Sequence, residues 1–168
     1  MTQTRPTKIS RPLYYSLGLT LIALICRCRY QTLMSLGRLL GRVAQRWMTR
    51  RAQIAKTNIA LCFPHQSFDW QTQCLRDYFE STGMAMVELW MTQWVDDARL
   101  KPLIEIDGAQ HYHAAQQSGR GIILLSAHIN APDFGARIAR LVLVEQSNSF
   151  VRKQNAPHLE QWFRDLRL

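Results

Sequence analysis

An uncharged, largely apolar run over residues 12–26 constrains this chain more than any other feature. Basic residues flank the run on both sides, and a helix that spans a bilayer needs about 20 apolar residues. Three interpretations are open: a short transmembrane anchor whose arginines reach the interface, an amphipathic anchor lying in the interface, and a cleaved signal peptide. Arg27 and Arg29 stand where the small residues of a cleavage site belong. We therefore predict that residues 1–30 form an N-terminal membrane anchor whose topology the sequence leaves open.

The charge balance indicates an anionic partner. The chain has 21 Lys and Arg residues against 12 Asp and Glu residues, a net charge of +9, and its first 56 residues contain no acidic residue. Phospholipid headgroups, a phosphorylated substrate, an acidic carrier protein and nucleic acid all fit this charge, and so does a solvated basic helix without a dedicated partner. The chain has no recognised nucleic-acid-binding motif, and the apolar run argues against that class. We therefore expect a membrane surface as a partner and no nucleic acid.

Residues 31–51 have the period of an amphipathic helix. Apolar residues recur at three- and four-residue steps, and arginines follow another face at four-residue steps. An apolar stripe beside a basic stripe suits a helix that lies on an anionic membrane. Gly37 and Gly41 form a GxxxG pair, which is weak evidence for helix dimerisation because an arginine lies inside it. The two stripes comprise Leu33, Leu36, Leu40, Val43 and Trp47 on one face, and Arg38, Arg42 and Arg46 on the other.

A long helix is predicted in the middle of the chain. Pro64 disfavours helical geometry at the residue before it and so ends the preceding helix. Ser67 or Asp69 can cap a new helix that runs towards Trp94. Glu88 lies amid the apolar part of this helix. A lone acidic residue in such a place is usually solvent-facing or ion-paired, and spacing alone does not mark it as catalytic.

From residue 103 onwards, the pattern changes to alternating strands and helices. An apolar run over residues 121–126 is typical of a parallel strand that is covered on both faces. Alternating strands and helices indicate an α/β domain. We therefore predict an α/β fold, in which an N-terminal membrane-anchoring helix and a helical segment precede the first part of a sheet domain. The predicted strands are residues 104–106, 121–126 and 149–152, and the predicted helices are residues 109–117, 133–141 and a segment from about residue 157.

His128 and Asp133 are the candidate catalytic pair. His128 follows the predicted strand of residues 121–126 at its carboxyl end, the edge where open α/β sheets bind ligands. Five residues within one helix set two side chains about 140° apart, because each residue turns about 100°. The two side chains can therefore meet only if His128 lies in the loop and Asp133 opens the next helix. Asn130 and Pro132 favour that arrangement, as cap-type and first-turn residues.

This pair suits acyl transfer. Histidine titrates near neutral pH, so it can take the proton from a hydroxyl group as that group attacks a thioester. A neighbouring carboxylate fixes the imidazole tautomer and stabilises the imidazolium. The backbone amides at the start of the helix can neutralise a developing oxyanion or hold a phosphate. The H-x4-D spacing alone also fits a structural histidine in a polar loop, and its place between an apolar strand and a helix start makes it more specific.

The four cysteines lack the spacing of a zinc site. Cys26, Cys28, Cys62 and Cys74 form no CxxC pair and have no histidine at ligand spacing. We expect packing residues in a reduced, cytoplasm-facing chain, with no metal.

Four segments together resemble the bacterial lipid A late acyltransferases, the lauroyl and myristoyl transferases of the lysophospholipid acyltransferase-like superfamily. They occur in the family's order and cover most of the chain after the predicted anchor. The segments are RRAQIAKTNIALCFP (residues 50–64), FESTGMAMVELW (79–90), GRGIILLSAHINAPDFGARI (119–138) and VRKQNAPHLEQWFR (151–164).

The resemblance implies roles for individual residues. The histidine of the family's H-x4-acid motif is the general base and corresponds to His128, and its acidic partner corresponds to Asp133. An arginine implicated in substrate binding corresponds to Arg152, with Asn155 beside it. The family implies an acyl-acyl-carrier protein as the donor substrate and no cofactor.

The chain departs from the family's pattern in two ways. Many late acyltransferases carry Glu where Asp133 stands, whereas the glycerolipid branch of the superfamily carries Asp, which weakens the assignment of the acceptor. Family members are also longer, and their later strands would complete the sheet and the acyl pocket. The resemblance therefore predicts a chain truncated at its C-terminus, so that residues 31–168 are the N-terminal portion of an acyltransferase domain with an open sheet edge.

The function that the resemblance implies is transfer of a fatty acyl chain from acyl-carrier protein to a hydroxyl of a lipid A precursor. The expected partners are the carrier protein, the anionic lipid acceptor and the membrane, and the expected location is the cytoplasmic side of the bacterial inner membrane. Two alternatives are open. One is an acyltransferase of the same superfamily that acts on a lysophospholipid or another glycolipid. The other is an inactive, truncated membrane-binding remnant.

Overall fold

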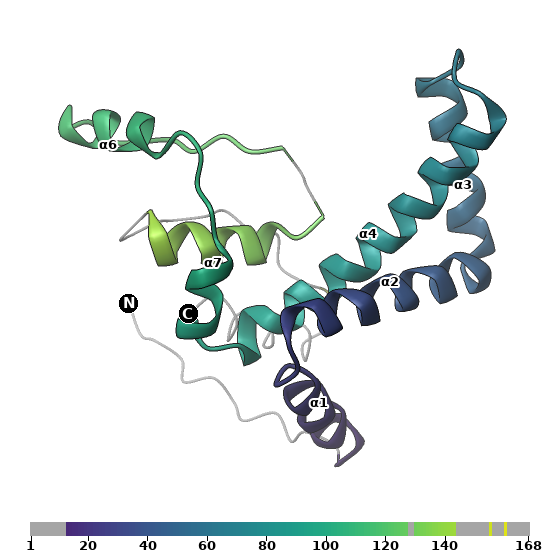
Figure 1. Ribbon diagram of the computed structural model, residues 1–168, viewed down its shortest axis with the longest axis horizontal. Helices are drawn as coiled ribbons and strands as arrows, with labels where there is room; N and C mark the ends of the chain where they lie inside the picture. Colours follow the sequence, from purple (N-terminus) through teal and green to yellow (C-terminus); the bar gives the residue numbers. More distant parts are fainter. Residues whose placement is uncertain (1–12, 128–129, 144–154, 156–159, 161–168) are drawn as a thin grey trace.

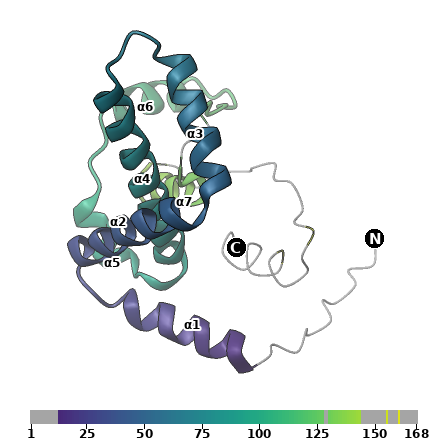
Figure 2. The same cartoon turned by 90° about the vertical axis from the view of Figure 1, so that its right-hand side faces the viewer.

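The computed structural model describes residues 13–127, 130–143, 155 and 160, and α4 (Phe68–Trp94) is its central helix (Figure 1). α2, α3 and α7 pack against α4, which is 27 residues long. α1 extends away from this helical body, as the two views show (Figures 1 and 2). The other elements are α1 (Leu13–Ile25), α2 (Tyr30–Trp47), α3 (Thr49–Cys62), α5 (Asp97–Leu100), the 3₁₀ turn η1 (Lys101–Leu103), α6 (Ala109–Gln117) and α7 (Pro132–Val142).

The amphipathic segment of residues 31–51 forms parts of two helices instead of one. α2 ends at Trp47, Met48 leaves helical geometry with φ −91° and ψ 56°, and α3 begins at Thr49. α2 packs along α4, and α3 forms a hairpin with the N-terminal part of the same helix (Figure 1). The continuous helix predicted over residues 31–51 is therefore wrong at Met48, because the chain bends there and both helices reach α4.

The start of α4 follows the predicted capping. The hydroxyl oxygen of Ser67 accepts a hydrogen bond from the backbone nitrogen of Trp70 at 3.2 Å. The side chain of Gln71 donates to the backbone oxygen of Phe63 at 3.0 Å and so fixes the turn between α3 and α4. The predicted helices of residues 109–117 and 133–141 are also confirmed, as α6 and α7.

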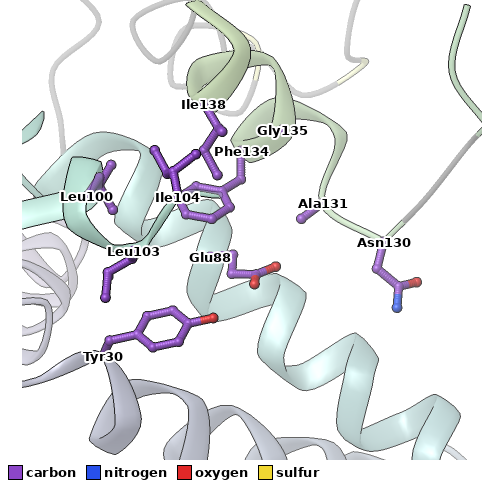
Figure 3. A pocket seen from close by; sticks show the side chains of 10 residues that line it. All are labelled: Tyr30, Glu88, Leu100, Leu103, Ile104, Asn130, Ala131, Phe134, Gly135 and Ile138. Carbon is purple, nitrogen blue, oxygen red and sulfur yellow. The ribbon is translucent and has the colours of Figure 1, made fainter. Parts of the chain in front are cut away.

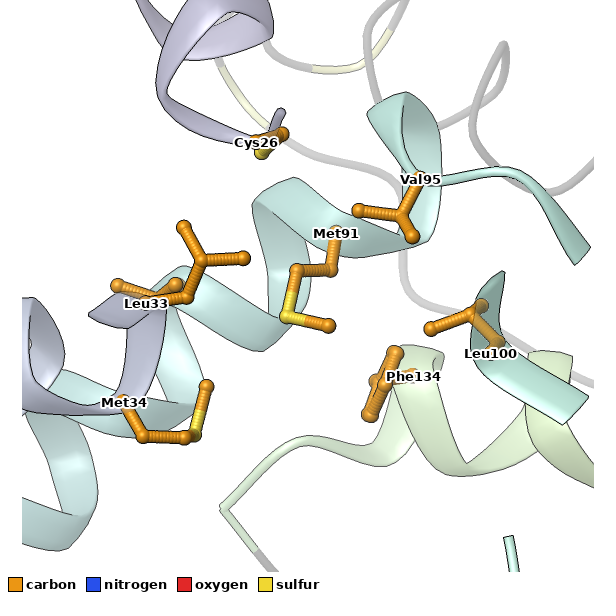
Figure 4. Packing of buried hydrophobic residues seen from close by; sticks show 8 residues of the cluster. Cys26, Leu33, Met34, Met91, Val95, Leu100 and Phe134 are labelled. Atoms are coloured by element: carbon orange, nitrogen blue, oxygen red, sulfur yellow. The ribbon is translucent and has the colours of Figure 1, made fainter. Parts of the chain in front are cut away.

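The hydrophobic core lies where α4 meets the end of α1, α2, α5 and α7 (Figure 4). Val87 and Met91 of α4 and Val95 at its C-cap recur at four-residue steps and present one apolar face to this core. Burial of a side chain of this size contributes about 1.5–3 kcal/mol. The other buried members of the cluster are Cys26, Leu33, Met34, Leu100 and Phe134.

Arg99 joins α5 to the end of α1. Its guanidinium donates to the backbone oxygen of Cys26 at 3.0 Å and to that of Cys28 at 2.7 Å. The last carbonyl groups of a helix lack partners within the helix and carry partial negative charge, so a cation there is favourable. This contact holds the end of α1 against the core although most of α1 lies outside it.

The predicted α/β sheet is wrong for the part of the chain that the structure describes. Residues 104–106 and 121–126 are irregular, and no strand occurs among the described residues. The third predicted strand, residues 149–152, lies outside them. A strand needs a neighbouring strand for its backbone N–H and C=O groups, and the described residues supply none. Ile123 and Leu125 are accordingly exposed, so the run predicted as a doubly covered strand is uncovered here.

The predicted N-terminal membrane-anchoring helix is also contradicted. α1 has 13 residues, which corresponds to a length of about 20 Å. The hydrocarbon core of a bilayer is about 30 Å thick. Within residues 13–127 and 130–143, the chain has no helix that combines the length and the apolar character needed to cross a membrane.

Candidate functional site

The structure places only part of the predicted site. Asp133 lies in the first turn of α7 and is half-buried, directly after Pro132 at the first helical position. His128 and Arg152 lie outside the described residues, and Asn155 is described as an exposed residue. The pairing of His128 with Asp133 and the substrate-binding role of Arg152 and Asn155 therefore stay predictions.

Asn130 fixes the loop that enters α7. Its side-chain nitrogen donates to the hydroxyl oxygen of Ser81 on α4 at 2.6 Å. The prediction of Asn130 as a cap-type residue is wrong, because Ala131 occupies the N-cap position. The sequence could not indicate this contact, since the two residues are far apart in the chain and meet only when α7 packs on α4.

Arg137 fixes α7 to the C-terminal end of α4. Its guanidinium donates to the backbone oxygens of Met91 at 2.9 Å, Thr92 at 2.6 Å and Val95 at 2.6 Å, and it pairs with the carboxylate of Asp97 at 2.5 Å. The last carbonyl groups of a helix carry partial negative charge, so the cation is favourable there, although the Met91 carbonyl also accepts the backbone N–H of Val95 at 3.1 Å. α7 is thus held on α4 at two places, one on either side of the centre of the contact.

A cavity of about 450 Å³ lies between these two attachments (Figure 3). Its volume falls in the range of small-ligand sites in proteins, about 300–1,000 Å³. One end is apolar, and Phe134 and Ile138 of α7 face Leu100 and Ile104 there (Figure 3). Asn130 lies at the opposite end. The cavity therefore combines a hydrocarbon-like wall with hydrogen-bonding groups.

Glu88 projects into the middle of the cavity from α4 (Figure 3). The carboxyl group is half-buried, and burial raises its pKa above the usual value. No cation among the described residues forms an ion pair with it. The expectation from spacing is a solvent-facing or ion-paired carboxylate; Glu88 is partly exposed and has no ion pair among the described residues.

Tyr30 at the start of α2 also lines the cavity, and its phenol oxygen points toward the Glu88 carboxylate (Figure 3). Burial raises the pKa of this phenol, the negative charge of Glu88 raises it further, and Arg38 acts in the opposite direction. The hydroxyl of Tyr30 therefore stays protonated at neutral pH and is available as a donor. Sequence reasoning missed both residues as site candidates, and the only signal was the place of Glu88 within an apolar helical segment.

The described residues offer no preformed metal site. No group of three or more His, Cys, Asp or Glu side chains gathers in residues 13–127 and 130–143. Cys26 is buried, and burial raises the pKa of its thiol. Cys28 and Cys62 are exposed and Cys74 is half-buried, and all four thiols are free.

Comparison with known proteins gives the family. The profile of the bacterial lipid A biosynthesis acyltransferases matches residues 2–168. The lauroyltransferase of lipid A biosynthesis from Escherichia coli (strain K12) is 34% identical over 133 residues, which are 78% of this chain and 44% of that protein. The palmitoleoyltransferase of the same strain is 31% identical over 124 residues, which are 74% of this chain and 40% of that protein.

A third relative agrees with these two. A lipid A biosynthesis acyltransferase from Haemophilus influenzae is 34% identical over 92 residues, which are 55% of this chain and 29% of that protein. The chain spans less than half the length of each of these curated relatives. No solved structure matches it. The match along nearly the whole sequence shows that the chain belongs to the bacterial lipid A biosynthesis acyltransferase family.

Proposed function

We propose that this chain carries out acyl transfer from an acyl-carrier protein to a hydroxyl group of a lipid A precursor. The observation that carries the proposal is the family match over residues 2–168, which includes the whole H-x4-D motif. The names of the relatives, a lauroyltransferase and a palmitoleoyltransferase of lipid A biosynthesis, support a fatty acyl group and a lipid A acceptor. The cavity beside α7, with its apolar wall and hydrogen-bonding groups, is compatible with a lipid substrate.

In the proposed reaction, His128 takes the proton of the acceptor hydroxyl as the oxygen attacks the thioester carbonyl carbon. Asp133 orients the imidazole and stabilises the imidazolium. Collapse of the tetrahedral intermediate forms the ester and breaks the carbon–sulfur bond. The proton then passes from His128 to the departing thiolate of the carrier protein. The position of Asp133 in the first turn of α7 supports this role, because it sets the carboxylate where the motif loop enters the helix.

The proposed partners are acidic. Arginines of α2 and α3 are exposed, and Trp47 beside them is 84% exposed. Anionic headgroups and an acidic carrier protein both complement such a surface. We place the reaction at the cytoplasmic side of the bacterial inner membrane, where the carrier protein and lipid precursor would meet the enzyme. The exposed arginines are Arg38, Arg42, Arg46, Arg50 and Arg51.

The test is an acyl-transfer assay on membranes from cells that produce this chain, with labelled acyl-carrier protein and a lipid A precursor. The variants are His128→Ala and, as a matched control, His65→Ala, which removes an exposed histidine from the α3–α4 turn. A version extended to the length of the relatives is assayed in parallel. Transfer that is lost in His128→Ala and retained in His65→Ala supports the proposal.

Other outcomes would redirect or contradict it. Transfer to a lysophospholipid and none to lipid A precursors would assign the enzyme to another branch of the superfamily. Transfer that survives His128→Ala would remove the histidine from the mechanism. Absence of transfer in the unmutated chain and in the extended version would contradict the proposed activity.

A further inference from the structure

α4 carries two acidic residues whose surroundings differ. The carboxylate of Glu80 accepts a hydrogen bond from the guanidinium of Arg42 at 2.7 Å and forms an ion pair with it. Glu88, two turns further along the helix, has no such partner among the residues that the structure describes, although it is half-buried. A half-buried carboxyl group without a cation loses part of its hydration, so its place in a cavity is a reason to look for a binding role.

The neighbours of Glu88 are uncharged hydrogen-bonding groups and hydrocarbon. The Tyr30 hydroxyl points toward the carboxylate, and Asn130 lines the end of the cavity opposite the apolar wall (Figure 3). Asn130 is two residues from His128 in the sequence and is bonded to Ser81 on the same helix as Glu88. Asn130 and Ala131, which precede α7, both line the cavity.

The chemistry of the two substrates decides which of them suits this carboxyl group. A carboxylate accepts hydrogen bonds and donates none when ionised. A fatty acyl chain offers it no donor, whereas a glycolipid acceptor carries hydroxyl groups besides the one that reacts. The apolar wall around Phe134 can meanwhile contact the hydrocarbon part of the same lipid.

We propose that the cavity between α2, α4 and α7 binds the acceptor lipid, with the Glu88 carboxylate as the hydrogen-bond acceptor for a hydroxyl group of that lipid other than the one that reacts. The Tyr30 hydroxyl, which points toward this carboxylate, supplies a donor beside it. The inference rests on the proposed acyl transfer and adds to it a third polar residue, which binds substrate and takes no proton. Glu88 thus holds the acceptor lipid in the cavity.

The experiment measures kcat and KM for each substrate separately, in detergent-solubilised protein carrying the full sequence. The variants are Glu88→Leu, Glu88→Gln and Tyr30→Phe, with Glu80→Gln as a matched control on the same helix. A lost hydrogen bond to a charged group predicts that kcat/KM for the acceptor falls about 10- to 100-fold in Glu88→Leu. In Glu88→Gln, which keeps an oxygen acceptor, kcat/KM for the acceptor falls less. In Tyr30→Phe it falls a few-fold. In all variants, KM for the acyl-carrier protein stays within about twofold of its value in the unmutated protein. In Glu80→Gln, kcat and KM for the acceptor stay within the same range.

Thermal unfolding separates this role from a structural one. A binding role predicts that Glu88→Leu does not lower the unfolding midpoint, because the substitution removes an unpaired carboxyl group from a half-buried position. An unchanged KM for the acceptor in Glu88→Leu, with transfer intact in the unmutated protein and lost in His128→Ala, would overturn this inference and leave the proposed function standing. A lower midpoint together with equal effects on both substrates would also overturn it. No transfer by the unmutated protein would overturn both.

Discussion

Gly41 of α2 and Gly83 of α4 lie against one another where the two helices cross. A Cβ atom on Gly83 would lie 2.6 Å from the backbone nitrogen of Gly41, and one on Gly37 would lie 2.7 Å from the Cα atom of Met84. Both distances are too short for real side-chain contacts, so the helices approach closely only because these positions lack a Cβ atom. The GxxxG pair, weak evidence for dimerisation at the level of sequence, serves packing within the chain.

Gly83→Ala is expected to destabilise the fold strongly. The added methyl group meets the backbone of α2, which cannot rotate away as a flexible side chain would. Overpacking of this kind costs about 1–3 kcal/mol or more. The check is thermal unfolding followed by far-UV circular dichroism. Gly18→Ala in α1 is the control, because nothing lies within 4 Å of its added Cβ atom, and it should stabilise its helix by about 0.5–1 kcal/mol. Equal midpoints for the two variants would contradict the close crossing.

Arg137→Ala is expected to loosen α7 from α4. It leaves the carbonyl groups of Thr92 and Val95 without the donor they now share, whereas the Met91 carbonyl keeps the backbone N–H of Val95. An unsatisfied, partly buried acceptor costs about 1–3 kcal/mol, so we expect a total loss of about 2–4 kcal/mol in chemical denaturation. Arg140→Ala, an exposed position on the same helix, is the control and should change stability by less than about 0.5 kcal/mol.

Arg137→Lys tests whether geometry or charge matters. The lysine keeps the cation but loses the planar fork that reaches several oxygens at once. It should therefore recover less than half of the lost stability. Full recovery of stability by lysine would show that a positive charge at the end of α4 is sufficient and that the separate hydrogen bonds are not required.

Local signals in the sequence predicted the helices well. Ser67 caps α4, Gly119 follows α6 with φ +67°, and Pro132 stands at the first position of α7. Each of these residues acts on the backbone within a few positions of itself, so its effect is visible without the fold. The strands failed for the opposite reason, because residues 121–126 need a partner strand that their own sequence does not contain.

The candidate site shows the same division. Asp133 was placed correctly in the first turn of a helix, since Pro132 marks that turn. The environment of Glu88 depends on Tyr30, Leu100 and Phe134, which come from other helices, so no spacing could reveal that it lines a cavity. An apolar neighbourhood in the sequence indicated that Glu88 was unusual, and only the packing of α7 on α4 shows what it faces.

Glu88→Gln is expected to raise stability at neutral pH. Burial raises the pKa of Glu88 in the folded chain, so the folded state binds this proton more tightly than the unfolded state. The loss of folding stability caused by burying the ionised Glu88 carboxylate is therefore absent below the unfolded-state pKa. It grows as pH rises through the folded-state pKa. We expect a gain of about 0.5–2 kcal/mol at pH 7, shrinking towards zero at pH 4.

The matched control for this pH dependence is Glu80→Gln, which removes an ion pair with Arg42 instead. It should leave stability unchanged or lower it at pH 7, whereas Glu88→Gln raises it. Chemical denaturation at a series of pH values measures both. A Glu88→Gln gain that is equal at pH 4 and pH 7 would contradict burial as the cause of the shift.

Asn130 and Ser81 are expected to be coupled, because one hydrogen bond joins them across the contact of α7 with α4. Each single replacement by alanine should cost about 0.5–1.5 kcal/mol, and the double variant should cost little more than either one. A double-mutant cycle in chemical denaturation measures this coupling. In the control cycle, Thr82→Ala replaces Ser81→Ala, because Thr82 is an exposed neighbour of Ser81. Because the bond fixes the loop two residues from His128, the same variants should lower kcat for acyl transfer more than KM. Additive losses in the cycle would show that the bond does not hold the loop.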